Sequence, residues 1–331
     1  MKKCFSILLL FTACLGSCSS QTSRQNDSLK LISLITLPEV SGRIDHLAFD
    51  SLHQKVFIAA VGNNSVEIVD LKNKTIIHSI SDLNEPQGIV FIPRSNSIFV
   101  ANGGNGECDV FDAGTFVKTN SIALGDDADN VRYDSLANTI YVGYGSGGIA
   151  IIDATTFTLI SQIKLSGHPE SFQLDRSANR IYANVPDAQL IEVIDPEKNI
   201  VIDKWEMKNA RSNFPMALDE TEHRLFIGCR HPAELLVIDT QTGKVISTLD
   251  TDSDADDIFF DDRSKEIYVS CGGGYIDVFK QTNVDEYTSN GKVETRSGAR
   301  TSLFIQSLSE LVVALPPGLT TEAELRIFEI K

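Results

Sequence analysis

Leu47-Ala48-Phe49-Asp50, followed after a few polar residues by Lys55-Val56-Phe57-Ile58-Ala59, is one copy of a unit that recurs seven times along the chain. The copies can be aligned on the residue seven before the centre of the second apolar run. These anchors are Asp50, Ile92, Asp134, Asp175, Asp219, Asp261 and Ile305. Their spacings are 42, 42, 41, 44, 42 and 44 residues. A repeat in the low forties is typical of propeller blades, so the sequence predicts an all-β, seven-bladed β-propeller.

Each unit is expected to form four short strands. Valine, isoleucine and aromatic residues alternate with polar ones, and Gly, Asn or Asp marks the turns. In the third unit the strands are predicted at residues 130–134, 139–143, 149–153 and 159–165. The third strand of several units ends in two apolar residues and an aspartate, which we interpret as a cap for backbone N–H groups of the next turn. These aspartates are Asp70, Asp153, Asp195 and Asp239.

The two ends of the sequence predict how the ring closes. Unit seven offers strands near residues 302–306, 310–315 and 325–330 and is one strand short. Residues 30–35 precede unit one and have the pattern of an outer strand. We therefore expect this N-terminal strand to complete the last blade, which removes an exposed strand edge.

The first residues are typical of an export signal. Met1-Lys2-Lys3 is a short positive start, and residues 5–15 form an apolar run too short to span a bilayer. The run ends in Leu15-Gly16-Ser17-Cys18, which resembles the bacterial lipobox and implies cleavage before Cys18 and lipidation of its thiol. An ordinary secretory leader is the alternative, and export follows from either interpretation. The predicted segments are a lipoprotein signal peptide (1–17), a polar tether (18–28) and the propeller (29–331).

Composition limits the partners that the protein can have. An apolar content of 42% is enough for a full core, and a net charge of −16 repels phosphate backbones, so no nucleic-acid partner is expected. Contact with a membrane is expected through the lipid anchor only. Beyond Cys18, three cysteines remain, and this odd number argues against a disulfide framework. They are Cys108, Cys229 and Cys271. We expect a monomer.

Several strands carry a family resemblance. Ile98-Phe99-Val100-Ala101-Asn102, Tyr141-Val142 and Tyr268-Val269-Ser270 resemble the strand signature of the YVTN family of seven-bladed propellers. The resemblance extends over residues 29–331 and implies the same fold. Most members of that family are binding proteins or uncharacterised proteins of the bacterial envelope. By fold the family belongs with the quinoprotein-like and haem d1-type propellers, so the fold alone implies little about reaction type.

A candidate site lies where the innermost strands of a propeller begin, because these positions line one face of the central channel. The residues four and five before each anchor are mostly polar, and nearby loops add further ionisable groups. Such a set can bind a polar ligand, although Asp and Asn at blade starts also cap neighbouring backbone. The predicted ligand-binding residues are Asp45, His46, Gln87, Asp129, Asn130, His168, Glu170, Arg211, Asn213, Arg230, Asp256, Asp257 and Arg300.

No catalytic residue and no cofactor can be identified from motifs. The glycines around Ser146 lack the Gly-x-Ser-x-Gly spacing of a serine hydrolase. Asp252, Asp254 and Asp256 begin like a calcium-binding EF-hand loop, but the later positions do not match it. A central divalent cation held by Asp45, Asp129 and Asp256 remains an alternative, because hard cations bind several carboxylate oxygens.

The sequence therefore predicts a recognition propeller anchored by lipid in the bacterial cell envelope, in the outer membrane and facing the periplasm or the exterior. Its central face is expected to bind a small polar ligand or an envelope protein. The alternative is a metal-dependent, lactonase-like hydrolase in which one of Asp45, Asp129 and Asp256 is essential. Lactonases of this type usually have six blades, so a binding protein is the preferred interpretation.

Overall fold

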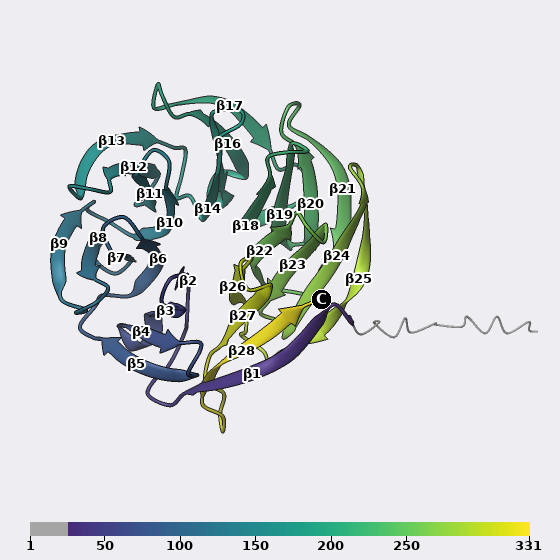
Figure 1. The fold of residues 1–331 in the computed structure, drawn as a ribbon. Helices are drawn as coiled ribbons and strands as arrows, with labels where there is room; N and C mark the ends of the chain where they lie inside the picture. The colour runs from purple at the N-terminus through teal and green to yellow at the C-terminus, as the bar shows by residue number, and fades with distance from the viewer. Residues whose placement is uncertain (1–25) are drawn as a thin grey trace, which may run out of the picture.

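Alternating apolar residues give the chain its strands, and the strands form seven four-stranded antiparallel sheets around a central axis (Figure 1). This structure, a computed structural model, describes residues 26–331. The predicted signal peptide and Cys18 lie outside these residues. The predicted seven-bladed all-β propeller is confirmed. In the part of the chain described, no helix is long and apolar enough to cross a membrane.

The strands follow one another from the centre to the rim of each blade. Blade 1 contains β2 (Leu47–Asp50), β3 (Lys55–Ala60), β4 (Ser65–Asp70) and β5 (Thr75–Ile80). Blade 2 contains β6 (Pro86–Ile92), β7 (Ser97–Asn102), β8 (Glu107–Asp112) and β9 (Lys118–Ala123). Blade 3 contains β10 (Ala128–Asp134), β11 (Thr139–Tyr144), β12 (Gly148–Asp153) and β13 (Thr158–Lys164). Blade 4 contains β14 (Ser171–Asp175), β15 (Arg180–Val185), β16 (Leu190–Asp195) and β17 (Ile200–Glu206).

The remaining blades have the same order. Blade 5 contains β18 (Arg211–Asp219), β19 (Arg224–His231), β20 (Ala233–Asp239) and β21 (Lys244–Asp250). Blade 6 contains β22 (Ala255–Asp261), β23 (Glu266–Cys271), β24 (Tyr275–Asn283) and β25 (Glu286–Glu294). Blade 7 contains β26 (Thr301–Ile305), β27 (Glu310–Leu315), β28 (Ala323–Ile330) and β1 (Leu29–Leu37). Two 3₁₀ turns, η1 (Val61–Asn63) and η2 (Pro186–Ala188), follow second strands.

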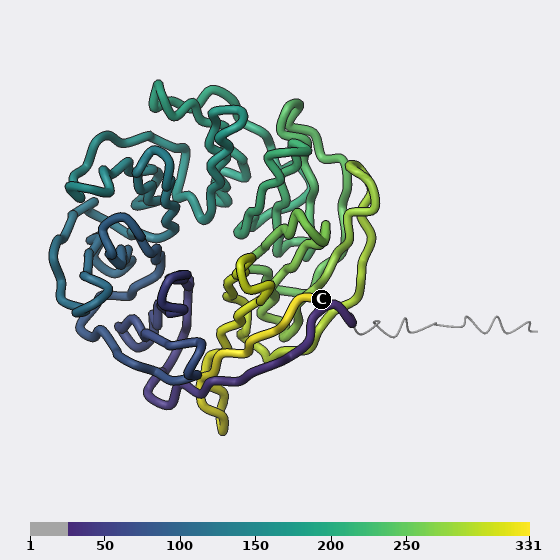
Figure 2. The backbone as a smooth tube through the Cα atoms, viewed as in Figure 1, coloured from purple at the N-terminus to yellow at the C-terminus, as the bar shows by residue number. Residues whose placement is uncertain are grey.

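Strand β1 closes the ring by pairing with β28 in blade 7, as predicted. The antiparallel register runs from Leu29 opposite Ile330 to Leu37 opposite Ala323, and Figure 2 shows the N-terminal strand beside the C-terminal one. The chain before β1 also contacts the propeller, because Asn26 Nδ2 donates to the Asn290 carbonyl oxygen at 2.6 Å. The end of the predicted polar tether therefore rests on blade 6.

The core lies between the blades. Seven buried apolar clusters fill the seven spaces between adjacent sheets. Between blades 1 and 2, for example, the rings of Phe57 and Phe91 stack with centroids 5.7 Å apart. All three cysteines of the described residues are free and buried in this core. Because the apolar residues are used between the blades, the innermost strands can present polar side chains to the central axis.

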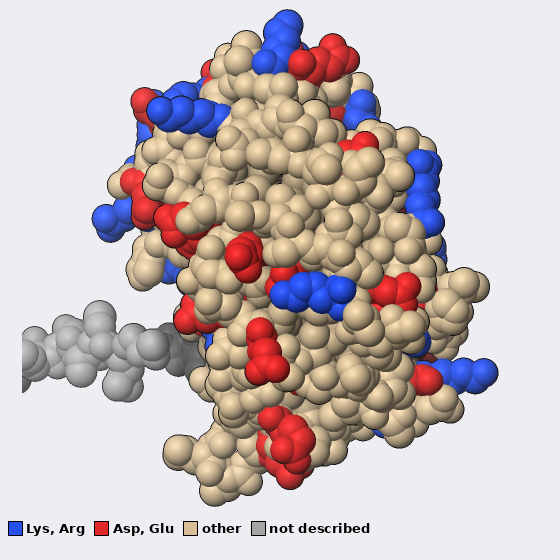
Figure 3. All heavy atoms as spheres, turned by 90° about the vertical axis from the view of Figure 1, so that its left-hand side faces the viewer, with Lys and Arg blue, Asp and Glu red and all other residues tan. Residues whose placement is uncertain are grey.

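Aspartates cap the turns, as the repeat predicts. Asp153 Oδ1 accepts hydrogen bonds from the backbone N–H groups of Thr155 and Thr156, both at 2.8 Å. The anchor Asp50 does the same for the turn between β2 and β3. On the side wall shown in Figure 3, acidic and basic side chains are interspersed among uncharged residues.

Candidate functional site

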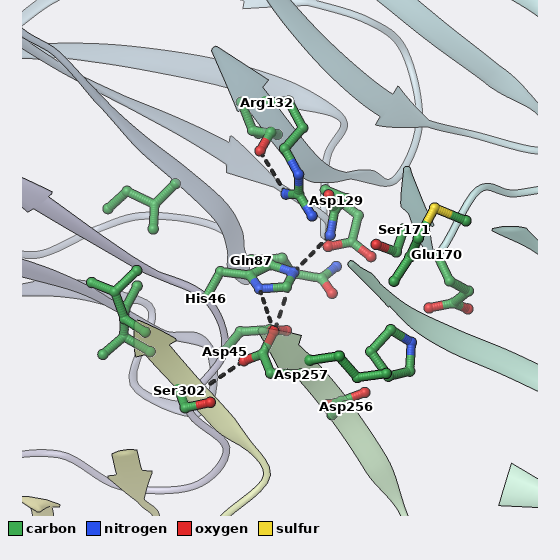
Figure 4. Close-up of a pocket in the computed structure, with 18 of the residues that line it drawn as sticks. Asp45, His46, Gln87, Asp129, Arg132, Glu170, Ser171, Asp256, Asp257 and Ser302 are labelled. Atoms are coloured by element: carbon green, nitrogen blue, oxygen red, sulfur yellow. Dashed lines mark hydrogen bonds and ion pairs between the residues drawn. The ribbon is translucent and has the colours of Figure 1, made fainter. Parts of the chain in front are cut away.

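A cavity of about 620 Å³ occupies the centre of the ring and is lined by all seven innermost strands or the residues directly before them. This volume is within the usual range of small-molecule sites. Ten charged or imidazole side chains line it, and Figure 4 shows His46, Arg132 and Glu170 among them. They are Arg43, Asp45, His46, Asp129, Arg132, Glu170, Arg230, Asp256, Asp257 and Arg300. The cavity is therefore strongly polar but of mixed sign.

Most of the residues predicted from the sequence meet in this cavity. The ten that line it are Asp45, His46, Gln87, Asp129, Asn130, Glu170, Arg230, Asp256, Asp257 and Arg300. They come from blades 1 to 6 and from the start of blade 7. Of the residues four and five before the anchors, all except Gly88 and Thr301 line the cavity.

Arg211 and Asn213 are not among the residues that line the cavity. The register of β18 against β19 shifts between Asn213 and Met216, and Asn213 is fully buried between blades 4 and 5. Its Nδ2 donates to Asn184 Oδ1 at 3.0 Å, which is a structural contact. Arg211 lies opposite His231 at the exposed start of β18.

His168 lies behind the cavity wall and supports Asp129. Its Nδ1 donates to the Gly145 carbonyl oxygen at 2.7 Å, and its Nε2 lies 3.7 Å from Asp129 Oδ2. Burial opposes the charged ring, but the hydrogen bonds to Asp129 and Gly145 raise the pKa of His168 to about 9. At neutral pH His168 is therefore a cation that pairs with Asp129.

Most of the arginines in the cavity pair with carboxylates. Arg43 Nη2 lies 3.0 Å from Asp45 Oδ2. Asp256 accepts from two arginines, with Arg230 Nη2 at 2.5 Å and Arg300 Nε at 2.9 Å. Burial raises the pKa of Asp256 to about 6, against the opposing effect of Arg300 and Arg230. These pairs fix the rim in one arrangement and leave little net charge there.

His46 connects three blades at the centre of the site (Figure 4). Asn130 Nδ2 donates to His46 Nε2 at 3.0 Å, while Nδ1 lies 4.0 Å from Asp257 Oδ1. Burial disfavours the imidazolium, but Asp45, Asp257 and Asp129 together raise the pKa of His46. A protonated imidazole needs a hydrogen-bond acceptor at Nε2. Rotation of the Asn130 amide by 180° would place Oδ1 there, and this oxygen has no hydrogen-bond partner in the present orientation.

Two carboxyl groups of the cavity titrate near neutrality. Burial raises the pKa of Asp257 to about 7, although His46 and the hydrogen bond from the Ser302 N–H oppose the shift. Burial also raises the pKa of Glu170 to about 7, and the negative charge of Asp129 adds to it. Groups with such shifts are concentrated at functional sites more often than elsewhere.

Sequence reasoning missed Arg132, which lies two residues before the anchor of β10. The residues at this position of all seven inner strands line the cavity, namely Ala48, Val90, Arg132, Gln173, Ala217, Phe259 and Leu303. Strand alternation already places them on the same face as the residues four before the anchor. Reading the seven units in columns at this position would have revealed one charge among mostly apolar residues.

The carboxylates that the sequence offered for a central cation have cationic neighbours. Asp45 pairs with Arg43, Asp256 with two arginines and Asp129 with His168. Of the EF-hand-like residues, Asp252 pairs with Lys292 at 2.9 Å. Within residues 26–331 no group of three or more His, Cys, Asp or Glu side chains is spaced to hold a metal ion. The central cation stays a prediction.

Comparison with known proteins establishes the fold. No profile of a known protein family matches the chain, and no curated protein sequence matches it either. A chain in the crystal structure of the mitotic checkpoint complex is similar with a TM-score of 0.77 and 14% identity, over 98% of this chain and 99% of that chain. Hydrazine synthase of Kuenenia stuttgartiensis is similar with a TM-score of 0.73 and 15% identity, over 85% of this chain and 94% of that one. As 1814 solved chains resemble it significantly, these likenesses identify a propeller and no activity.

Proposed function

We propose that this chain is a recognition propeller whose central cavity binds a small polar ligand or a polar segment of an envelope protein. The propeller fold itself suggests a binding or scaffold role. The observation that carries the proposal is the cavity of about 620 Å³ with its ten charged or imidazole side chains. Turn capping does not require so many ionisable groups in one place, whereas recognition of a polar ligand does.

The choice between a small ligand and a protein segment depends on the shape of the site. The similar propeller in the mitotic checkpoint complex belongs to a multiprotein assembly, which supports a protein partner in general terms. The polar groups of this chain, however, converge inside the channel. A small molecule or a narrow loop reaches them, and a flat protein surface does not.

The hydrolase alternative is not favoured. As predicted from the sequence, it requires one of Asp45, Asp129 and Asp256 to be free to bind a metal or to activate water, and each of the three has a cationic partner.

The ligand proposal is tested with the purified full chain in a thermal-shift screen against small polar compounds, followed by calorimetry on the hits. We expect at least one hit to bind the wild-type chain, and the triple variant Asp45→Ala, His46→Ala, Asp129→Ala to bind it at least about tenfold more weakly. The matched control is Glu206→Ala with Lys208→Ala, an exposed pair on the outer strand of blade 4 and its following turn. Equal affinity of the triple variant and the control for every hit would falsify the cavity assignment.

We also propose that the chain is a YVTN-type lipoprotein of the bacterial envelope, exported and anchored through Cys18. The support is the lipobox-like Leu15-Gly16-Ser17-Cys18 after an apolar run, together with the strand signature quoted above. Metabolic labelling with an alkyne fatty acid should tag the wild-type chain and leave Cys18→Ala untagged. Equal labelling of the two chains would contradict the anchor and leave the cavity proposal unaffected.

A further inference from the structure

Two charged side chains of the cavity stand apart from the paired rim. Arg132 donates Nη1 to the carbonyl oxygen of Val131 at 2.9 Å, and its guanidinium lies 5.6 Å from the centre of the Phe172 ring. It forms no ion pair with any residue in the range 26–331, in contrast to Arg43, Arg230 and Arg300. Arg132 therefore enters the cavity with most of its N–H donors unused.

Glu170 is the corresponding anion. Its backbone N–H donates to the Asn184 carbonyl oxygen at 3.2 Å, which fixes the main chain at the start of blade 4. Its carboxylate has neither an ion pair nor a hydrogen bond within the described part of the chain, and it lines the cavity. Arg132 and Glu170 come from the inner edges of adjacent blades (Figure 4).

The surroundings of Arg132 define what such a pair can hold. In the other six inner strands, the position of Arg132 is taken by Ala48, Val90, Gln173, Ala217, Phe259 and Leu303. This wall is mostly apolar, and burial lowers the pKa of Arg132 against the attraction of Asp257 and Asp129. A charge in such surroundings is partly desolvated, so an added counter-ion gains more than it would on the surface.

A purely anionic ligand would pair with Arg132 but leave the Glu170 carboxylate without a partner, and the net charge of −16 of the chain disfavours its approach. A purely cationic ligand would leave Arg132 unpaired. Only a molecule that carries both charges gives Arg132 and Glu170 each an ion-pair partner. An apolar part between or beside the charges would lie against Val90, Phe259 and Leu303.

We propose that the cavity binds a small zwitterion with an apolar side group, such as an apolar α-amino acid, whose carboxylate pairs with Arg132 and whose ammonium group pairs with Glu170. This inference rests on the proposed recognition function and names its ligand class. The interaction is reversible ion pairing and hydrogen bonding, and no covalent bond forms or breaks.

The test is calorimetry on the purified full chain with leucine, methionine and phenylalanine. Two derivatives of each amino acid are measured as well, the N-acetyl amino acid, which lacks the ammonium group, and the methyl ester, which lacks the carboxylate. The parent amino acid should bind most tightly, because each derivative lacks one of the two charges. Arg132→Gln should weaken the parent and the N-acetyl derivative at least about tenfold and leave the ester unchanged. Glu170→Gln should weaken the parent and the ester by a similar factor and leave the N-acetyl derivative unchanged.

Two further variants complete the experiment. Arg132→Lys keeps a positive charge and should recover part of the affinity that Arg132→Gln loses, which separates a charge effect from a folding defect. Arg94→Gln changes an exposed arginine in the turn between β6 and β7 and should leave every affinity as in the wild-type chain. Loss of binding by all variants alike, including Arg94→Gln, would contradict the assignment.

The outcomes distinguish this inference from the function on which it rests. If no amino acid binds the wild-type chain at millimolar concentration, the zwitterion class is wrong. If another polar compound then binds the wild-type chain and does not bind the triple variant of Asp45, His46 and Asp129, the recognition function stands with a different ligand. If an amino acid binds and Arg132→Gln has no effect, Arg132 is not the anion subsite.

Discussion

Aspartates at the blade turns and carboxylates in the central cavity are the same chemical group in opposite electrostatic situations. In the turn after β8, Asp112 Oδ1 accepts from the backbone N–H groups of Gly114 and Thr115 at 3.1 and 2.7 Å. The Thr115 hydrogen bonds lower the pKa of Asp112, which faces solvent. In the cavity, burial raises the pKa of Asp257 and Glu170 to about 7.

The difference teaches which carboxylates hold the fold and which are available for recognition. A turn aspartate is stabilised in its charged form because local N–H donors surround it. A cavity carboxylate has lost its water and lacks enough donors to replace it, so its charged form is disfavoured until a ligand or a cation approaches. The first kind contributes stability, and the second kind keeps interaction free energy available for binding.

The largest expected effect is on a buried turn aspartate. Asp50 is 1% exposed and accepts from the backbone N–H groups of Leu52 and His53 at 3.0 and 3.2 Å. Asp50→Ala should lower the free energy of unfolding by about 2 kcal/mol, because the turn loses these acceptors. Urea unfolding monitored by fluorescence measures the change. Asp50→Asn keeps one acceptor oxygen and should lose clearly less, so equal losses would argue against the capping role.

The division between the two kinds of carboxylate was only partly predictable from sequence. The repeat length and the apolar alternation identify the blades, because both follow from local backbone geometry. The turn aspartates are equally local, since each caps donors two or three residues ahead, as Asp153 does. The closing strand β1 was predictable because an incomplete blade needs a partner for its edge.

The orientation of individual side chains at the rim was not predictable in this way. Several inner strands shift register near their start, for example between Ala128 and Val131 and between Asn213 and Met216. Such a bulge breaks the simple alternation of faces, and in blade 5 it directs Asn213 into the wall. The pairing of Asp256 with Arg230 and Arg300 depends on contacts between blades, which no single unit contains.

A smaller effect, of opposite sign, is expected at Asp257. The free carboxyl of an unfolded chain titrates near pH 4, whereas Asp257 titrates at about 7 in the folded chain. Between these values the folded state binds more protons than the unfolded state, so stability falls as the pH rises and levels off above about 7. Asp257→Asn removes this penalty and keeps an acceptor for the Ser302 N–H, but it loses the attraction to His46.

We therefore expect Asp257→Asn to be more stable than the wild-type chain by about 1 kcal/mol at pH 8, with the difference shrinking toward pH 5. Denaturant unfolding at both pH values measures it. In the wild-type chain Glu170 acts in the same direction over the same range. His168, with its pKa of about 9, adds a further loss between about pH 6.5 and 9. A variant less stable than wild type at pH 8 would show that the charged form of Asp257 supports the fold.

The smallest effect is expected at the exposed turn aspartate Asp112. Its pKa is lowered in the folded chain, so just below pH 4 the unfolded state binds more protons than the folded state. The stability that Asp112 contributes is therefore present above about pH 4 and lost as the pH falls. Because the group faces solvent, Asp112→Asn should cost less than about 1 kcal/mol at pH 7. The same substitution should cost even less near pH 3, the reverse of the trend at Asp257. Denaturant unfolding of the wild-type chain and of both variants between pH 3 and 8 measures how each stability difference changes with pH. If the slopes have the same sign, the turn and cavity carboxylates are not in opposite electrostatic situations, and burial does not disfavour the charged form of Asp257.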